Sequence, residues 1–182
     1  LGRASRGMEE TLSIVETNSC FSDGIQFSTG NTFGNNGLIY RNFGKTAFTL
    51  VKRGAKGIRL RVKEDGLIEN RHPEAQELFR KVVKDKEGTE EEEKLLGEKW
   101  REAAFDLLDP PIKDLFHIEK GVKPEIPDYA PIFEDDYCSK CGEKIMAPKA
   151  VNKGNKILCL QCAGESFYQL DGRGLSSVNR EN

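Results

Sequence analysis

Long apolar runs are missing from this sequence, and histidine is scarce. No apolar run approaches the roughly 20 residues needed to span a bilayer, and no secretory signal pattern is visible, so we expect a cytoplasmic protein without a membrane partner. The 182 residues include two histidines, His72 and His117, and each is expected to be structural. Net charge is also nearly absent: 28 basic and 30 acidic side chains give -2. The chain as a whole is therefore no polycation built to coat nucleic acid.

What the sequence does contain is enough apolar material for a folded core. Hydrophobic residues make up 37% and charged residues 32% of the chain. This composition argues against disorder over the whole length, and the length suits one domain plus a small module. The sequence opens at Leu1 without an initiator methionine, so we expect native sequence ahead of it.

The hydrophobic pattern predicts strands in the first third of the chain and helices in the second. Strands are expected over residues 38–40, 46–51 and 58–62, and residues 12–16 fit a strand or a helix end. One helix is expected to begin at Pro73, and a second is capped by Thr89 and stopped by Pro110. Further prolines predict a linker over residues 119–135. These elements predict an α+β fold, with an antiparallel sheet core and packed helices.

Four of the five cysteines form two pairs of the type C-x2-C. The pairs are separated by 17 residues and consist of Cys138, Cys141, Cys159 and Cys162. Two such knuckles supply the four thiolates that zinc binds in a tetrahedron. Two disulfides are the alternative, and they would require an oxidising compartment. A closed site of four thiolates is normally structural, so we expect a structural zinc in a module of residues 136–182 that ends in a polar tail.

Between and after the two knuckles the sequence predicts a treble-clef zinc finger. Residues 145–146 and 157–158 are expected to pair as a hairpin that turns at residues 152–155. Residues 163–170 fit a short helix after the last pair of ligands. A hairpin between the knuckles followed by a helix is the treble-clef arrangement, whereas a plain zinc ribbon would end in a strand.

The fifth cysteine, Cys20, lies among small polar residues and glycines. A short helix is expected here, with Asp23 as a capping residue and Gln26 at its end. At a helix start the dipole would favour the thiolate of Cys20, as a nucleophile or a metal ligand. A small apolar core residue is the other interpretation, and both stay open at this point.

The stretch from Asn18 to Arg53 resembles the family of the formylmethanofuran dehydrogenase E subunit. Three motifs carry the resemblance in order: Cys-x-x-Asp-x-x-Gln, Gly-Asn-Thr-x-Gly and Gly-Lys-x-Ala-Phe. The similarity covers most of residues 5–118, and a C-terminal zinc finger is a familiar appendage in that family. The resemblance implies a core of residues 1–118 that forms a homodimer and carries a metal site.

The resemblance also indicates which residues would serve a metal in the core. Family members commonly place a His-Gly-His-x-Cys-Pro-Gly segment ahead of this region and a cysteine where Asn31 stands, and this sequence has neither. Cys20 is then the candidate ligand for a second metal. Asp23, Gln26 and Asn31 are the candidates for its immediate surroundings.

Three functions follow as hypotheses. The first is a metal-binding protein of this E-subunit family, an accessory or stand-alone relative of a molybdenum or tungsten oxidoreductase. The family's parent complex reduces carbon dioxide onto methanofuran in methanogenesis, but no complete catalytic site is visible in this chain. The alternative is a zinc-finger module that binds nucleic acid or a partner protein through its lysines, which are Lys140, Lys144, Lys149, Lys153 and Lys156. The third is a structural interaction protein that pairs with another copy of itself.

Overall fold

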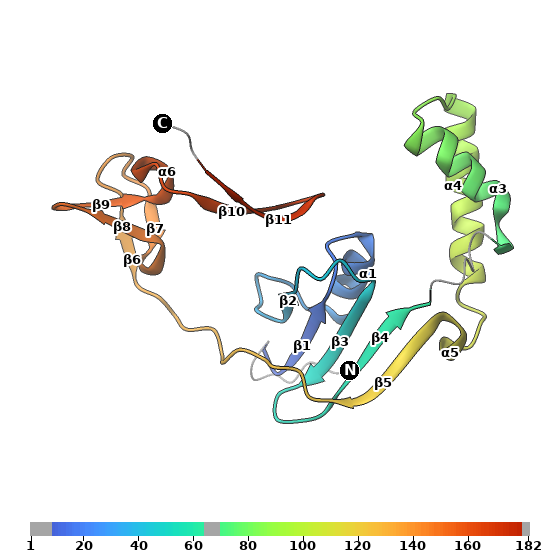
Figure 1. The fold of residues 1–182 in the computed structure, drawn as a ribbon, viewed down its shortest axis with the longest axis horizontal. Coiled ribbons are helices and arrows are strands. Elements are labelled where there is room, and N and C mark those ends of the chain that lie inside the picture. Colours follow the sequence, from blue (N-terminus) through green and yellow to red (C-terminus); the bar gives the residue numbers. More distant parts are fainter. Residues whose placement is uncertain (1–8, 64–69, 180–182) are drawn as a thin grey trace. The chain divides into compact units, whose positions relative to one another are not determined.

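The computed structural model describes residues 9–63 and 70–179. The chain forms two compact units. One unit contains the described residues before Arg59 and after Lys120, and the other contains residues 59–120. Figure 1 shows the elements in chain order. The predicted α+β fold with a sheet rich in antiparallel pairs is confirmed, and its strands follow the order β2-β1-β3-β4-β5.

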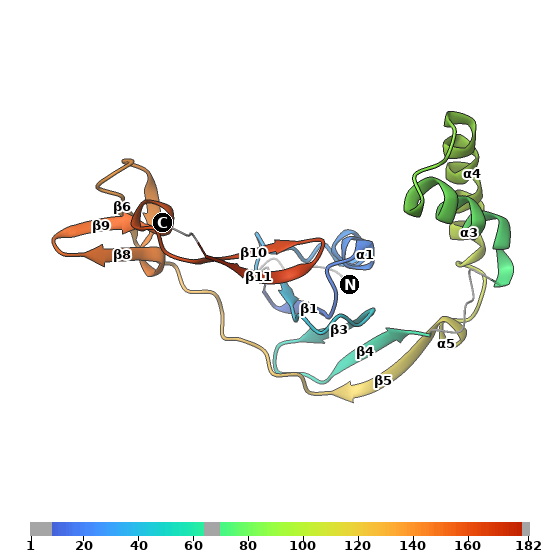
Figure 2. The same ribbon diagram turned by 45° about the horizontal axis from the view of Figure 1, so that its top comes forward.

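Strand β1 is the centre of the first unit. The elements around it are β1 (Thr11–Val15), α1 (Cys20–Thr29), β2 (Leu38–Tyr40) and β3 (Ala47–Lys52). Strand β1 runs parallel to β2, with Ser13 opposite Leu38, and antiparallel to β3, with Ile14 opposite Thr49. Figure 2 shows β1 and β3 side by side near α1. Of the two options that the sequence left open for residues 12–16, a strand or the end of a helix, the structure shows the strand, which ends at Val15.

Both faces of β1 are covered, and alternation along the strand separates them. On one face the Ser13 hydroxyl donates a hydrogen bond to Thr29 of α1 at 3.3 Å. On the other face Leu12 and Ile14 form the buried apolar cluster together with Val51 of β3. Each such side chain contributes roughly 1.5–3 kcal/mol when it is fully buried. Helix α1 thus covers one face, where Val15 is also buried and Phe21 of α1 packs against Phe48, and the cluster of Leu12, Ile14 and Val51 lies on the opposite face.

The second unit is dominated by two helices. Its elements are β4 (Gly57–Val62, whose first two residues belong to the first unit), α3 (Pro73–Phe79), a π-helical turn η1 (Arg80–Lys84), α4 (Glu90–Asp106), α5 (Ile112–Leu115) and β5 (Phe116–Val122, which ends in the first unit). Phe79 of α3 packs edge-on against Trp100 of α4, with ring centroids 5.7 Å apart. The predicted capping box is present, because the Thr89 hydroxyl accepts from the Glu92 amide and the Glu92 carboxylate accepts from the Thr89 amide.

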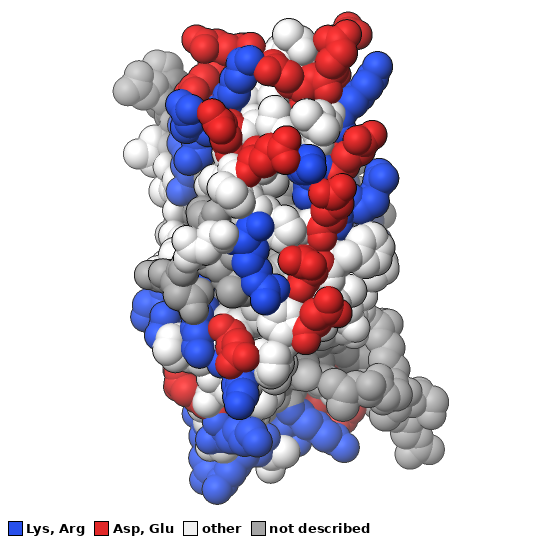
Figure 3. All heavy atoms as spheres, turned by 90° about the vertical axis from the view of Figure 1, so that its right-hand side faces the viewer, with Lys and Arg blue, Asp and Glu red and all other residues white. Residues whose placement is uncertain are grey.

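The surface of the helical unit carries mixed charge. Figure 3 shows acidic side chains gathered at the top, where α4 begins, with basic side chains interleaved below them. Helix α4 opens with four consecutive glutamates, which is the arrangement that the positive end of the helix dipole favours. No helix in residues 9–63 or 70–179 is both long and apolar enough to cross a membrane.

The zinc module belongs to the first unit and consists of three two-stranded pairs. Its elements are β6 (Asp135–Tyr137), β7 (Lys144–Met146), a 3-10 turn η2 (Ala147–Lys149), β8 (Ala150–Lys153), β9 (Lys156–Cys159), α6 (Leu160–Ala163), β10 (Phe167–Asp171) and β11 (Gly174–Val178). Strand β6 pairs with β7, β8 with β9, and β10 with β11, all antiparallel.

Two sequence predictions for this module were wrong. Residues 145–146 pair with β6 instead of residues 157–158, whose partner is β8. The helix expected over residues 163–170 ends at Ala163, because Gly164 adopts a left-handed φ of 70°. Residues 167–171 form β10 instead, and the expected polar tail supplies its partner strand β11.

Candidate metal centre

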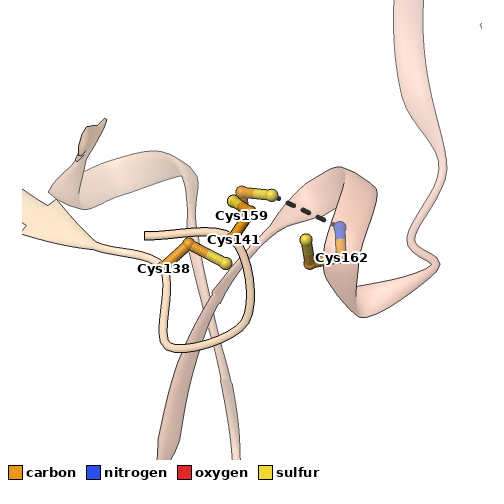
Figure 4. A group of neighbouring side chains, drawn as sticks. All are labelled: Cys138, Cys141, Cys159 and Cys162. Atoms are coloured by element: carbon orange, nitrogen blue, oxygen red, sulfur yellow. Dashed lines mark hydrogen bonds between the residues drawn. The ribbon is translucent and has the colours of Figure 1, made fainter. Parts of the chain in front are cut away.

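The four cysteines of the two knuckles meet in one cluster. The sulfur atoms of Cys138, Cys141, Cys159 and Cys162 all lie within 4.8 Å of one another. Figure 4 shows the four side chains converging from a loop and from the start of α6. Zinc–sulfur bonds of about 2.3 Å place the sulfurs of a tetrahedral site about 3.8 Å apart. The donor set and its spacing therefore fit zinc. Within residues 9–63 and 70–179, no other group of His, Cys, Asp or Glu meets the same criterion.

The first knuckle is built by backbone hydrogen bonds. The Cys138 amide donates to the Glu143 carbonyl at 2.9 Å, and the Gly142 amide donates back to the Cys138 carbonyl at 2.8 Å. Gly142 has a φ of 76°, which a residue with a side chain rarely adopts. The Ser139 amide donates to the Ile157 carbonyl at 2.8 Å and so ties this knuckle to β9. Cys138 is buried as a result.

The second knuckle joins a strand to a helix. Cys159 is the last residue of β9 and the N-cap of α6, and its sulfur accepts a hydrogen bond from the Cys162 amide at 3.3 Å (Figure 4). Short helix α6 places Cys162 one turn after Cys159, so the two sulfurs face the same ion.

The pKa values of these thiols show why a cation belongs among them. Backbone amide donation, from Cys141 first and then from Cys159, lowers the pKa of Cys138 to about 6. The hydrogen bond with the Cys159 sulfur, followed by burial, raises the pKa of Cys162 to about 12. One thiol thus ionises readily, whereas another keeps its proton because a hydrogen bond to a neighbouring sulfur and burial both favour its protonated form. A divalent cation is what would stabilise all four thiolates together.

One acidic neighbour of the cluster was missed by the sequence reasoning. The Glu143 carboxylate lies 3.6 Å from the Cys141 sulfur, within hydrogen-bonding reach for sulfur. Its position two residues after Cys141 was the only local signal, and exposed acidic residues are too common for that signal to be specific.

The lysines of the module divide into two groups. Lys144 forms an ion pair with Asp135 at 2.6 Å, and Lys153 forms one with Glu165 at 2.9 Å. Lys140, Lys149 and Lys156 are exposed and form no ion pair within the described residues. The positive charge available for phosphate contact is therefore smaller than the sequence count indicates.

Helix α1 is longer than the helix that the sequence analysis expected: it begins at Cys20 after the N-cap Ser19, so Asp23 does not cap it, and it continues past Gln26 to Thr29. Cys20 is the first residue of α1 and is exposed, and Asp23 lies one turn further on the same helix. Gln26 lies a further turn along and is half-buried. These three side chains do not form a recognisable metal cluster with other described residues. A metal in the core stays a prediction.

Asn31 has a structural role in this fold. Its side chain is buried, and its amide group donates to the Ser13 hydroxyl at 2.9 Å. Its backbone amide donates to the Thr29 hydroxyl at 3.2 Å. This network joins the end of α1 to the buried side of β1.

Comparison with known proteins assigns both parts of the chain. The family model described as "FmdE, Molybdenum formylmethanofuran dehydrogenase operon" matches residues 1–117, and that of the "Prokaryotic dksA/traR C4-type zinc finger" matches residues 131–166. A solved structure of an FmdE-like protein of the tungsten formylmethanofuran dehydrogenase type, from Syntrophus aciditrophicus, shares the fold, with a TM-score of 0.52 and 23% identity. That likeness covers 85% of this chain and 71% of the other.

A curated relative extends beyond this chain. A protein of Archaeoglobus fulgidus, named as a probable S-adenosyl-L-methionine-binding protein, is 44% identical over 174 residues. The match covers 95% of this chain and 46% of the relative, so the chain spans about half the length of that protein.

Proposed function

Because the chain belongs to the FmdE family, we propose that it is a metal-binding protein akin to the E subunit of formylmethanofuran dehydrogenase. In this proposal it acts as an accessory subunit, or as a stand-alone relative, of a molybdenum or tungsten oxidoreductase in the cytoplasm. The observation that carries the metal-binding part is the convergence of four cysteine sulfurs within 4.8 Å. Thiolate ligands of this kind suit a reducing compartment.

The zinc of the C4 finger is structural in this proposal. Four thiolates close a tetrahedral zinc site, whereas catalytic zinc keeps a position open for water or substrate. The chain's own residues hold the ion and orient the two knuckles. Any chemistry of the accessory complex therefore lies elsewhere, in a partner or at the candidate core site around Cys20.

Metal analysis of the purified protein tests both sites. We expect about one zinc per chain in the C4 finger and a second metal bound through Cys20. Cys159→Ser should remove the zinc, and Cys20→Ser should remove only the second metal. If the wild type binds one zinc per chain and Cys20→Ser binds the same amount, there is no metal site at Cys20, and only the zinc site of the C4 finger is supported. Wild-type protein without zinc, after purification in the absence of chelators, would contradict the metal-binding proposal itself.

The partners belong to the same proposal. We propose a homodimer that joins an oxidoreductase complex, on the basis of family membership. Light scattering coupled to gel filtration gives the mass of the wild-type particle directly. A monomer at micromolar concentration would argue against the homodimer. Co-expression with the oxidoreductase subunits of the source organism, followed by purification through one tagged component, tests the complex.

A zinc-finger module that binds nucleic acid or a partner protein is the second candidate. Three exposed lysines without ion pairs in the described module favour it, namely Lys140, Lys149 and Lys156. Replacing all three by alanine should weaken nucleic-acid binding in fluorescence anisotropy at moderate salt. The matched control replaces Lys84, Lys113 and Lys120, which are exposed lysines outside the module. No binding by the wild type would dismiss nucleic acid as the ligand.

A further inference from the structure

Residues 123–130, between β5 and the zinc module, lie on the core of the first unit. Prolines at 124 and 127 keep this segment extended. Ile126 packs on the apolar face of the sheet, against the cluster of Leu12, Ile14 and Val51. This is the face opposite α1. The segment that sequence composition marks as a linker thus covers part of the core.

Two arginines contact this segment. The Arg41 side chain donates to the Glu125 carbonyl, and Arg53 makes three further contacts. The Arg53 guanidinium donates to the Pro127 carbonyl at 2.6 Å and to the Asp128 carbonyl at 3.4 Å. It also lies over the Tyr129 ring, 4.2 Å from the centroid. The Arg53 side chain is only 12% exposed, which strengthens a cation–π contact relative to one in open solvent. Arg53 directly follows β3, so it is positioned by the rigid sheet.

Two carboxylates complete the attachment. The Tyr129 hydroxyl donates to Glu10 at 2.9 Å, and the Ala130 amide donates to Glu9 at 2.9 Å. Glu9 also faces Arg53 at 3.6 Å, and its carbonyl accepts from the Arg53 side chain at 2.9 Å. The residues before β1 and after β3 therefore hold the segment together, and the positive charge of Arg53 offsets that of the Glu9 carboxylate.

We propose that residues 123–130 form a strap, latched by Arg53, that sets the reach of the zinc module. With the strap docked, residues 131–134 are the tether to β6, and they span at most about 14 Å at 3.3–3.6 Å per residue. With the strap released, residues 123–134 become the tether, with a maximum span of about 40 Å. The latch therefore sets the length of the tether that precedes the module, and the Asn18 side chain, which donates to the Asp171 carbonyl of β10, is a further contact between the module and the core.

Hydrogen exchange and limited proteolysis test the strap on the intact chain. In the wild type the Ala130 amide should exchange slowly, because its hydrogen is bonded to Glu9. Glu-C protease cleaves after glutamate, and it should cut slowly after Glu125 while the strap is docked. Arg53→Ala should speed both exchange over 125–131 and cleavage after Glu125 by about tenfold or more, since several contacts are lost together. Cleavage after Glu134 should not change, which provides an internal reference.

Matched variants separate the latch from general damage. Arg80→Ala removes an exposed arginine of the helical unit, whose ion pair with Asp85 measures 3.5 Å, and should leave the strap protected. Tyr129→Ala should release the strap more than Tyr129→Phe, which keeps the ring. Equal protection of the strap in wild type and Arg53→Ala, with zinc content intact, would overturn the proposal. Fast exchange at Ala130 in the wild type would overturn it without any variant, even if Arg53→Ala fails to fold.

Discussion

At the scale of single residues, Gly37 is constrained by two asparagines. A Cβ atom at Gly37 would lie 2.7 Å from the Asn31 side-chain oxygen and 2.9 Å from that of Asn35. Neither amide can move freely, because Asn31 is bonded to Ser13 and the Asn35 oxygen accepts from the Gly37 amide at 3.0 Å. A Cβ at Gly37 would therefore approach two side chains that hydrogen bonds already hold in place.

Gly37→Ala should therefore destabilise the first unit by about 1–3 kcal/mol, as overpacking commonly does. Gly34→Ala is the matched control, since a Cβ at Gly34 meets nothing within 4 Å. That variant should stay within about 0.5 kcal/mol of the wild type. Urea unfolding followed by circular dichroism measures both. Similar midpoints for the two variants would contradict the crowding at Gly37.

The hydroxyl of Tyr129 predicts a pH dependence of the latch. Donation to the Glu10 carboxylate, followed by burial and by the charges of Glu10 and Glu9, raises the pKa of Tyr129, while Arg53 acts in the opposite direction. A raised pKa means that the docked strap binds this proton more tightly than the free strap does. The stabilisation is complete below the pKa of a free tyrosine, about 10, and it is lost as pH rises through the raised value.

Phenolate absorbance at alkaline pH measures this shift. Subtracting the absorbance of Tyr129→Phe from that of the wild type leaves the titration of Tyr129 alone, one of the four tyrosines of the chain. Its midpoint should lie above that of free tyrosine. In Arg53→Ala, where the strap is released, the midpoint should return toward the ordinary value. A wild-type midpoint at or below that of free tyrosine would be inconsistent with the Glu10 contact.

Residue roles were predictable from the sequence where they depend on near neighbours. The spacing within each C-x2-C pair brings two sulfurs to one ion through a single turn, and the capping box at Thr89 spans only three residues. Asn31 could not be assigned in the same way, because its partner Ser13 lies 18 positions away on another element. The two carbonyls that Arg53 binds, those of Pro127 and Asp128, lie 74 and 75 positions along the chain. No local sequence pattern could therefore indicate this contact.

At the scale of elements, helix α4 depends on its N-terminal cap. Thr89→Ala removes the acceptor of the Glu92 amide and should destabilise the helical unit by about 1 kcal/mol. Thr89→Ser keeps a hydroxyl and serves as the control. Hydrogen exchange of the first turn of α4 should rise in the alanine variant and change little in the serine variant. Unchanged exchange in both would show that the first turn is held by other contacts.

Strand pairing limited what the sequence showed about the module. Ala163 to Leu170 has apolar residues that fit a helix when read alone, but Leu170 pairs with Leu175 and Phe167 with Val178 in a hairpin. A strand is defined by a partner that lies outside any local window, whereas a helix carries its hydrogen bonds within itself. The same reason explains why β7 was assigned to the wrong partner. Prediction of β2, β3 and β4 succeeded because alternation is regular over β4 and the glycine turns between these strands are short.

At the scale of the whole molecule, the module and the core rely on different sources of stability. The core has a buried apolar cluster of its own, with the strap packed against it. The strands of the module are three to five residues long, in three separate pairs, and isolated hairpins of this size are marginal in water. In the described module Cys138 is the only residue in the buried apolar set. A zinc ion held by the four cysteines would therefore be the principal link between the two knuckles.

Removal of zinc should accordingly unfold residues 135–163 while β1 and β3 stay folded. Structural zinc sites release about 10–16 kcal/mol on binding in small finger peptides, far more than these short strands supply. After chelation, verified by elemental analysis, amide exchange should rise throughout the module, including at Ser139, and should not change at Ser13 or Glu16. The strap should stay protected too, because its contacts are with the core. Unchanged exchange in the module after verified loss of zinc would mean that packing alone holds the knuckles. Exchange that rises equally in the core would mean that the two parts unfold as one cooperative unit.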